Sequence, residues 1–378
     1  MNILTKSLII VIGILALFFA GCKPEDKTPA FIYATYSVLS RLVPEEMDVE
    51  YQKDYDFIYI QAMPHWKETD FDKPIETIID SMVDKHQYER QEIFTTFIET
   101  VHRAGSKLLI SFSGGRFINV AKDPVRRHRF AVYMASFAKK HNYDGLELDW
   151  EGTVTKELHL EMIKALRAEL DSLEKLDGRR YWLTTALNCE HNYSAEEASK
   201  LSASLDWINI MYYDMGGGYW GNKATHNAPL NVIKDNYETN WSRFDRKKIH
   251  IGLANYGYYY EGICPEMELP SGDKLSKHGS RDFFMSELPD LQKAGWKEIW
   301  DEKACCPYYL SPEWGEIDPL KVQAAPEKSA FVSAENQRSI DMKVQWAREM
   351  GFGGVFWWEF HCDWISNQDG GGRHILHI

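Results

Sequence analysis

The sequence has few positive charges for its length. Its 378 residues hold 43 Lys and Arg against 56 Asp and Glu, a formal net charge of -13. Such a chain repels phosphate backbones and anionic lipid headgroups, so nucleic acid is not an expected partner. The composition also lacks the bias of disordered or fibrous chains, since 44% of the residues are hydrophobic and 26% are charged. We therefore expect a globular protein of one large domain or two small ones.

The N-terminal apolar stretch is too short for a membrane-spanning helix. Residues 8–20 form an apolar stretch of 13 residues, whereas a helix needs roughly 20 to cross a bilayer. The stretch follows Lys6 and ends in small residues, so we interpret residues 1–21 as a signal peptide. The end of this segment, Phe19-Ala20-Gly21-Cys22, resembles a bacterial lipobox. That resemblance implies a lipid on Cys22, a polar tether over residues 22–29, and attachment to the membrane in a bacterial cell envelope. A plain secretory signal with an incidental cysteine is the alternative.

The cysteine spacing lacks a zinc-binding pattern. Two of the six cysteines, Cys305 and Cys306, are adjacent, which is a poor geometry for binding one metal ion. No CxxC or HxxxH motif accompanies them. If Cys22 carries lipid, five cysteines remain in an exported chain, where disulfides are chemically allowed. We expect no metal site.

Short apolar, β-branched or aromatic runs alternate with amphipathic stretches along the chain. We expect eight strands, at residues 31–36, 57–62, 107–112, 145–150, 182–187, 207–212, 249–255 and 354–359. Between the fourth and fifth, leucines and a methionine recur every three or four residues from Leu158 to Leu173, which predicts a helix. Eight strands with helical crossovers predict a (β/α)8 TIM barrel over residues 30–378. An open doubly wound sheet would need a Gly-rich phosphate loop after an early strand, and the chain has none.

Residues 258–328 break this alternation. The segment is rich in Pro, Gly, Tyr, Trp and Cys and is far too long for a bare loop. We interpret it as an insertion between the seventh strand and the last helix. It is expected on the C-terminal face of the barrel, where the loops of this fold build active sites.

Three acidic residues alternate with apolar ones in the expected fourth strand. Glu147, Asp149 and Glu151 point to one face, while Leu146, Leu148 and Trp150 point to the other. In a barrel the apolar face packs on the outer helices, so the acids line the interior near the C-terminal mouth. Crowding should raise the pKa of at least one carboxyl and leave it protonated beside an ionised partner. Glycoside cleavage needs such a pair, although a structural network of acids is the alternative.

Five stretches in order along the chain carry a family resemblance. They are Asp144–Glu151 for DGxDxDxE, Ser111–Gly115 for SxGG with one extra residue, Met211–Asp214 for MxYD, Gly252–Gly257 for GxPxYG with Ala254 in place of Pro, and residues 339–359 for the last helix and eighth strand. Together they resemble the motifs of family 18 glycoside hydrolases, which are chitinases and endo-β-N-acetylglucosaminidases.

The resemblance implies a substrate-assisted retaining mechanism. Glu151 would be the general acid, and the 2-acetamido oxygen of the substrate would attack the anomeric carbon to give an oxazolinium intermediate. Asp149 would hold the acetamido N–H, and Tyr213 would donate its hydroxyl to the acetamido oxygen. Asp214 would bond the sugar or the acid. Trp358 would be the floor on which the sugar stacks.

Further aromatic residues are candidates for sugar subsites. They are Tyr33, Tyr36, Trp220 and Tyr256. Gly114 and Gly115 more plausibly allow a close backbone approach than take part in chemistry.

The sequence departs from the family at Glu147, where the family has Asp. The side chain is one methylene longer, which bears on the ionisation of Asp149. Because Asp149 and Glu151 are kept, we expect activity to survive.

The sequence therefore predicts a chitinase-like hydrolase of β-1,4-linked N-acetylglucosaminides that needs no cofactor. Its partner would be an oligo- or polysaccharide that contains N-acetylglucosamine. Asp149-Trp150-Glu151 resembles chitinases more than the Asp-Asp-Glu of relatives that cleave N-glycans. An endo-β-N-acetylglucosaminidase acting on N-glycans and a non-catalytic glycan-binding protein of the cell envelope are the alternatives.

Overall fold

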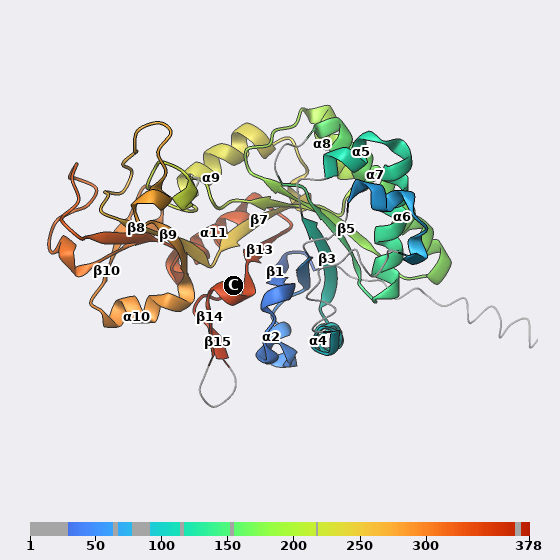
Figure 1. The fold of residues 1–378 in the computed structure, drawn as a ribbon, viewed down its shortest axis with the longest axis horizontal. Helices are drawn as coiled ribbons and strands as arrows, with labels where there is room; N and C mark the ends of the chain where they lie inside the picture. The colour runs from blue at the N-terminus through green and yellow to red at the C-terminus, as the bar shows by residue number, and fades with distance from the viewer. Residues whose placement is uncertain are drawn as a thin grey trace, which may run out of the picture. The chain divides into compact units, whose positions relative to one another are not determined.

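Eight parallel strands close into a barrel (Figure 1). The computed structural model describes residues 29–62, 67–77, 91–113, 117–151, 155–216, 218–366 and 372–378. The barrel order is β1-β13-β7-β6-β5-β4-β3-β2. The strands are β1 Ile32–Val38, β2 Phe57–Ala62, β3 Lys107–Ser113, β4 Gly145–Asp149, β5 Trp182–Asn188, β6 Trp207–Met211, β7 Ile249–Ala254 and β13 Gly354–Trp358. Each lies within two residues of its predicted range, which confirms the (β/α)8 fold.

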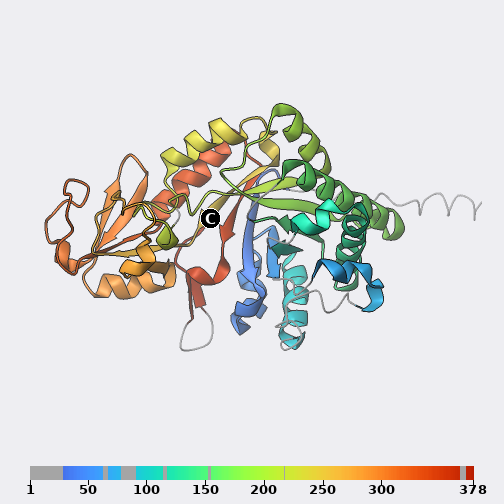
Figure 2. The same ribbon diagram turned by 45° about the horizontal axis from the view of Figure 1, so that its top comes forward.

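Helices lie outside the barrel strands (Figure 2). They are α2 Val49–Gln52, α4 Gln91–Ala104, α5 Phe117–Lys122, α6 Pro124–Lys140, α7 Lys156–Asp177, α8 Ala195–Ser204, α9 Leu230–Asn236, α10 Leu288–Lys293 and α11 Gln337–Met350. Helix α7 buries Met162, Leu166 and Leu170 on one face, as the spacing predicts. Gly178 caps its C-terminal end, and the φ of 71° lies in the left-handed region that a residue without Cβ adopts at low cost.

The segment between β7 and α11 forms a second sheet. Its five antiparallel strands run in the order β10-β11-β12-β8-β9 and are drawn beside the barrel in Figure 1. They are β8 Tyr256–Glu261, β9 Arg281–Phe284, β10 Lys297–Asp301, β11 Cys306–Leu310 and β12 Ala330–Ser333. Strand β8 begins two residues after β7 ends, so the sheet is anchored directly at the mouth of the barrel.

Short elements complete the described chain. The 3-10 helices used below are η1 Leu39–Arg41, η2 Pro44–Met47, η5 Gly218–Trp220 and η11 Phe360–Cys362, and a hairpin pairs β14 Trp364–Ser366 with β15 Gly372–His374. The five cysteines in the described ranges are all free thiols. No helix in this part of the chain is long and apolar enough to cross a membrane. The predicted signal peptide and Cys22 lie outside the described residues, as do Gly114 and Gly115.

Candidate active site

The alternation of strand β4 places its acids inside the barrel. On the outer face, the Trp150 ring lies 5.7 Å from that of Phe117 and 5.7 Å from that of His159, measured between ring centroids. Glu147 and Asp149 therefore face the interior, where 1% and 3% of their surfaces are exposed. Apolar packing of one face of the strand thus fixes the direction of the carboxylates on the other.

Glu147 lies in a cage of hydrogen-bond donors from three other strands. Its Oε2 accepts from the Tyr36 hydroxyl at 2.6 Å, and its Oε1 accepts from Asn209 Nδ2 at 2.7 Å and Thr184 Oγ1 at 3.1 Å. Asn209 Nδ2 also donates to the Tyr36 hydroxyl at 3.0 Å. Burial raises the pKa of Glu147, while hydrogen bonds from its neighbours oppose that rise. The longer side chain is therefore accommodated by a dedicated set of partners.

Tyr36 and Tyr33 do not lie where the subsite predictions put them. Tyr36 is only 2% exposed and stacks on Tyr59 with ring centroids 4.6 Å apart, so its ring is covered and its hydroxyl serves Glu147. Tyr33 lies near the start of β1, at the end of the strand away from the mouth, and its hydroxyl accepts a hydrogen bond from Arg348. Sequence alternation cannot distinguish an aromatic ring in the barrel core from one that faces a ligand, which explains both errors.

Asp149 and Glu151 form a coupled pair of carboxyls. Burial raises the pKa of Asp149 well above its usual value, the negative charges of Glu151 and Glu147 raise it further, and it is hydrogen-bonded to Glu151. Glu151 is exposed at the barrel mouth, where partial burial of its carboxyl and the charge of Asp214 raise its pKa. A hydrogen bond between two carboxyls requires a proton, and the raised pKa of both groups favours a proton on the pair. Asp149 Oδ1 has no hydrogen-bond partner among the described residues.

Tyr213 follows strand β6 and lies close to the acids. It is 6% exposed, and its ring meets that of Tyr256 edge to face at 5.9 Å. Gly252 on the adjacent strand leaves room for this ring, because a Cβ there would lie 2.7 Å from Tyr213 Cε1. Burial raises the pKa of the Tyr213 hydroxyl, and the charges of Asp214 and Asp149 raise it further. The hydroxyl therefore stays protonated and can donate a hydrogen bond.

Asp214 is held in a backbone conformation unusual for a residue with a side chain. Its φ is 59°, and its backbone N–H donates to Asn227 Oδ1 at 2.7 Å. Its carboxylate accepts from the Tyr256 hydroxyl at 2.5 Å and also from the Tyr258 hydroxyl. Burial raises the pKa of Asp214, and these two hydroxyls lower it in part. Tyr256, predicted as a subsite residue, is 7% exposed and orients Asp214.

Two tryptophans remain available to a ligand. Trp358 is half-buried at the end of β13, with its ring centroid 5.4 Å from that of Tyr36, and a cis peptide bond joins it to Glu359. Trp220 in η5 is 45% exposed and meets the Tyr258 ring edge to face at 5.6 Å. Both rings can therefore offer apolar surface to a sugar.

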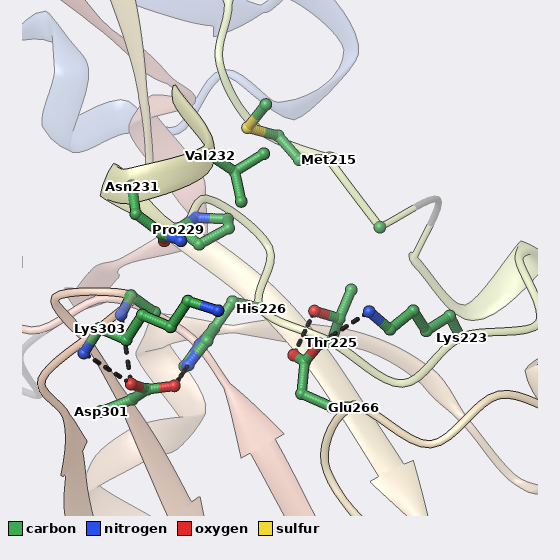
Figure 3. A pocket seen from close by; sticks show the side chains of 12 residues that line it. Met215, Lys223, Thr225, His226, Pro229, Asn231, Val232, Glu266, Asp301 and Lys303 are labelled. Atoms are coloured by element: carbon green, nitrogen blue, oxygen red, sulfur yellow. Dashed lines mark hydrogen bonds and ion pairs between the residues drawn. The ribbon is translucent and has the colours of Figure 1, made fainter. Parts of the chain in front are cut away.

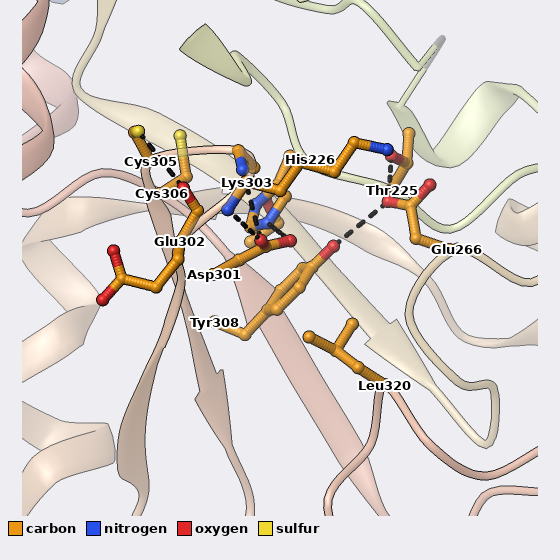
Figure 4. A network of polar contacts seen from close by, with 12 residues as sticks. Thr225, His226, Glu266, Asp301, Glu302, Lys303, Cys305, Cys306, Tyr308 and Leu320 are labelled. Atoms are coloured by element: carbon orange, nitrogen blue, oxygen red, sulfur yellow. Dashed lines mark hydrogen bonds and ion pairs between the residues drawn. The ribbon is translucent and has the colours of Figure 1, made fainter. Parts of the chain in front are cut away.

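A cavity of about 380 Å³ is lined by Met215 and Gly216, which follow Asp214, and by His226 and Asp301 (Figure 3). The buried His226 stacks on Tyr308 with ring centroids 3.8 Å apart, and its Nε2 lies 3.4 Å from Asp301 Oδ2. The close approach of His226 lowers the pKa of Asp301 to about 2. Tyr308 in turn donates to Glu266 at 3.2 Å, which extends the network across the insertion sheet (Figure 4). Since Asn227 follows His226, this network holds the residue that fixes Asp214.

Sequence reasoning missed three residues that build the site. Thr184 and Asn209 hold Glu147, and Tyr258 holds Asp214. A signal existed for the first two, since each is a polar residue at an inward position of an apolar barrel strand. Tyr258 lies in a run of three tyrosines, and only the register of β8 decides which of them reaches the mouth.

Comparison with known proteins agrees with this arrangement. The model of the family named Glycosyl hydrolases family 18 matches residues 47–363. The chain belongs to this family. The match confirms the resemblance seen in the sequence, and it spans seven of the eight barrel strands, including β4 with its acids, while β1 precedes it.

Several chitinases are similar in sequence. Chitinase A1 of Niallia circulans is 27% identical over 298 residues, which cover 68% of this chain and 40% of that protein. The endochitinase of Brugia malayi is 24% identical over 284 residues, which cover 68% of this chain and 54% of that protein. The chain thus matches about half, or less, of the length of these relatives.

Solved structures share the fold at low sequence identity. The family 18 chitinase of Cycas revoluta in complex with (GlcNAc)3 has a TM-score of 0.67 at 20% identity, covering 88% of this chain and 96% of that one. A family 18 N-acetylglucosaminidase from Paenibacillus barengoltzii has a TM-score of 0.63 at 20% identity, with the same coverage. These likenesses show that the chain shares the fold of the two solved structures.

Proposed function

We propose that this chain is a chitinase-like hydrolase of β-1,4-linked N-acetylglucosaminides. The observation that carries the proposal is the placement of Asp149 and Glu151, whose carboxyls both have a raised pKa, beside the hydroxyl of Tyr213. Membership of family 18 and the similarity to chitinases support it.

Glu151 is the general acid in the first step. It gives its proton to the glycosidic oxygen, and the bond between that oxygen and the anomeric carbon breaks. The acetamido oxygen of the same sugar forms a bond to the anomeric carbon, which gives an oxazolinium ion. Tyr213 donates a hydrogen bond to the acetamido oxygen and orients it for attack. Asp149 Oδ1, which lacks a partner among the described residues, accepts the acetamido N–H and stabilises the positive charge.

Water completes the reaction in the second step. The ionised Glu151 removes a proton from water as the water oxygen attacks the anomeric carbon. The bond between that carbon and the acetamido oxygen breaks, so the amide is restored and the product keeps its original anomeric configuration. Glu151 ends protonated, ready for the next cycle.

The spacing of the carboxyls favours this scheme over the two-carboxylate schemes. Inverting glycosidases separate their carboxyls by about 6.5–9.5 Å to leave room for water, and retaining enzymes with a carboxylate nucleophile separate them by about 5–5.5 Å. Asp149 and Glu151 are hydrogen-bonded to each other, which is closer than either arrangement. This contact supports a role for Asp149 in assisting the substrate amide and not as a nucleophile on the opposite face of the sugar.

Glu147 favours protonation of the pair formed by Asp149 and Glu151. Its negative charge raises the pKa of Asp149, and its cage of donors holds the carboxylate fixed while the pair changes charge. The substitution of Glu for the Asp of the family is thus compatible with turnover.

Trp358 is the floor of the site, and its exposed ring surface packs against the sugar that is cleaved. The cleaved sugar must carry an N-acetyl group, since its amide performs the displacement.

The test is a product profile over matched substrates. Wild-type protein is incubated with chitin oligomers, the same oligomers without N-acetyl groups, and high-mannose and complex N-glycans. We expect cleavage of the acetylated chitin oligomers alone. Cleavage of the deacetylated oligomers would refute the role of the amide, and cleavage of N-glycans alone would make the protein an endo-β-N-acetylglucosaminidase.

Two variants separate an enzyme from a glycan-binding protein. Glu151→Gln should bind chitin oligomers and cleave them at least a hundredfold more slowly. Glu349→Gln, which changes an exposed glutamate at the end of α11, is the control and should match wild type. Binding without cleavage by all three proteins would support the binding protein.

We also propose a lipid anchor on Cys22 that holds the protein in a bacterial cell envelope. The lipobox-like sequence before this cysteine supports the proposal. Mass spectrometry of the native protein should find a diacylated N-terminal cysteine, and Cys22→Ala should release the protein from membranes. An unmodified Cys22 in native protein would contradict the proposal.

A further inference from the structure

The cavity beside the segment that follows Asp214 has a wall of polar side chains (Figure 3). Its volume of about 380 Å³ lies at the lower end of the range, roughly 300–1,000 Å³, of sites that hold small molecules. The acids that cleave the glycosidic bond in the proposed mechanism do not line it. The cavity is therefore open to a ligand other than the cleaved sugar.

The buried ring of His226 has an unused nitrogen in this wall. Only 2% of His226 is exposed. Its Nδ1 lies 3.2 Å from the Ser333 hydroxyl, which also accepts the backbone N–H of Asn227 at 3.1 Å. We assign the hydroxyl proton to the bond with Nδ1, which leaves the ring N–H on Nε2. That Nε2 lies 3.4 Å from Asp301 Oδ2 and has no hydrogen-bond partner among the described residues. The wall therefore holds one unsatisfied donor.

Two oxygens in the wall are available to accept hydrogen bonds. Asp301 Oδ1 accepts the backbone N–H groups of Lys303 at 2.9 Å and Ala304 at 3.2 Å, whereas Oδ2 is approached by His226 at 3.4 Å. Because that approach lowers the pKa of Asp301 to about 2, its carboxylate is ionised. Asn231 Oδ1 is buried and has no partner among the described residues. An ammonium group suits this pair of acceptors, since charged donors bind carboxylates most strongly.

One lysine in the wall is available to an anion. Lys223 pairs with Glu266 at 2.7 Å, so these two charges offset each other. The exposed Lys303 also lines the cavity, and its ammonium makes no ion pair with a carboxylate of the described residues. It can therefore bind a carboxylate from a ligand. Apolar surface comes from Met215, Pro229, Val232 and Ala304.

We propose that this cavity binds a small aliphatic α-amino acid as its zwitterion. The ammonium group donates to Asp301 Oδ2 and Asn231 Oδ1, and the carboxylate accepts from Lys303 and from His226 Nε2. The short side chain packs on the apolar surface. A zwitterion satisfies the donors and the acceptors of the wall together, whereas a simple amine or a simple acid satisfies one set and leaves the other unpaired. The inference goes beyond the proposed function, because the ligand is neither substrate nor product of glycoside cleavage.

The test is calorimetric binding of L-valine to the purified protein, compared with two analogues. N-acetyl-L-valine lacks the ammonium group, and isobutylamine lacks the carboxylate. Wild type should bind L-valine at least about tenfold more tightly than either analogue, since each analogue loses charged hydrogen bonds. No binding of L-valine at about 10 mM would mean that water alone fills the cavity and would overturn the proposal. Equal binding of L-valine and either analogue would also overturn it.

Two variants locate the binding in this cavity. Lys303→Ala should weaken the binding of L-valine about tenfold, and because Lys303 is exposed this variant should fold normally. Asp301→Asn removes the charge but keeps the acceptor of the backbone N–H groups, and it should weaken binding by a similar factor. Wild-type affinity in both variants would show that L-valine binds elsewhere and would refute the proposal.

Lys297→Ala is the matched control. Lys297 lies in β10, the strand that ends at Asp301, but it does not line the cavity. Its ammonium pairs with Glu316 at 3.0 Å, and 61% of its side chain is exposed. The affinity of this variant for L-valine should equal that of wild type.

The N-acetylglucosamine trimer separates this cavity from the substrate cleft. A saturating concentration of the trimer should change the affinity of wild type for L-valine by less than about twofold. If the trimer displaces L-valine, the cavity belongs to the substrate cleft and the proposal is wrong. Because these measurements report binding alone, they decide the proposal whether or not the protein cleaves chitin oligomers.

Discussion

Replacing His361 with Gln should remove a large, pH-dependent part of the stability of the barrel mouth. His361 Nε2 lies 2.6 Å from Glu46 Oε1, and its Nδ1 lies 2.8 Å from Glu359 Oε2. Both carboxylates are fully buried. Burial alone would lower the pKa of His361, but the hydrogen bonds and charges of Glu359 and Glu46 raise it to about 9. At neutral pH the imidazolium therefore joins η2 to the end of β13.

The magnitude follows from the difference between the folded and unfolded pKa of His361. The folded pKa is about 9 and the ordinary value is 6.5. A gap of about 2.5 pH units corresponds to about 3 kcal/mol, at about 1.36 kcal/mol per unit. Because the folded value is raised, this contribution is fully present below pH 6.5 and is lost as the pH rises through 9.

The assay is urea unfolding of wild type and His361→Gln between pH 6 and pH 10. The difference in the free energy of unfolding should shrink by about 3 kcal/mol over this range. His278→Gln is the control, because His278 pairs with Asp273 at 2.8 Å but is 48% exposed. Its difference from wild type should be small and constant. A difference between wild type and His361→Gln that does not change with pH would refute the reasoning.

The remaining predictions concern the active site. Tyr36→Phe removes the 2.6 Å hydrogen bond to Glu147. We expect kcat to fall about tenfold and the melting temperature to change little. An unchanged kcat would mean that the hydrogen-bond donors around Glu147 do not affect catalysis. Because the pKa values of Asp149 and Glu151 are raised, kcat should fall only as the pH rises through a value above 4.5, the ordinary glutamate pKa. A loss of kcat near pH 4.5 would count against a proton held by the pair. Trp358→Ala should raise KM for chitin oligomers about tenfold, and steady-state kinetics with an unaltered KM would exclude a sugar floor there.

Much of the fold could be predicted from the sequence because its signals are local. Each barrel strand is a short buried run whose length and composition differ from those of the flanking helices. The position of the inserted segment could be predicted from the break in the alternation, but the pairing of its strands could not. Its antiparallel pairs, such as Tyr308 with Ser333, join residues far apart in the chain, and no local pattern specifies that register.

The candidate site also has a part that local sequence patterns predict and a part that depends on contacts between distant strands. Glu147, Asp149 and Glu151 lie on one strand, so alternation alone gave their common face. The contacts of Glu147 come from β1, β5 and β6, and the sequence does not state which side chains of those strands meet it. Tyr36 illustrates this limit of sequence reasoning. Its aromatic side chain suggested a surface for binding sugar, but the residue is buried and donates a hydrogen bond to Glu147.

The central claim is that the amide of the substrate displaces the leaving group while Glu151 supplies the proton. The most direct measurement is the anomeric configuration of the first product released from the N-acetylglucosamine hexamer, followed by proton NMR before mutarotation. The account predicts the β anomer, because attack by the amide and then by water inverts the anomeric carbon twice. Release of the α anomer would mean a single displacement by water and would contradict the account.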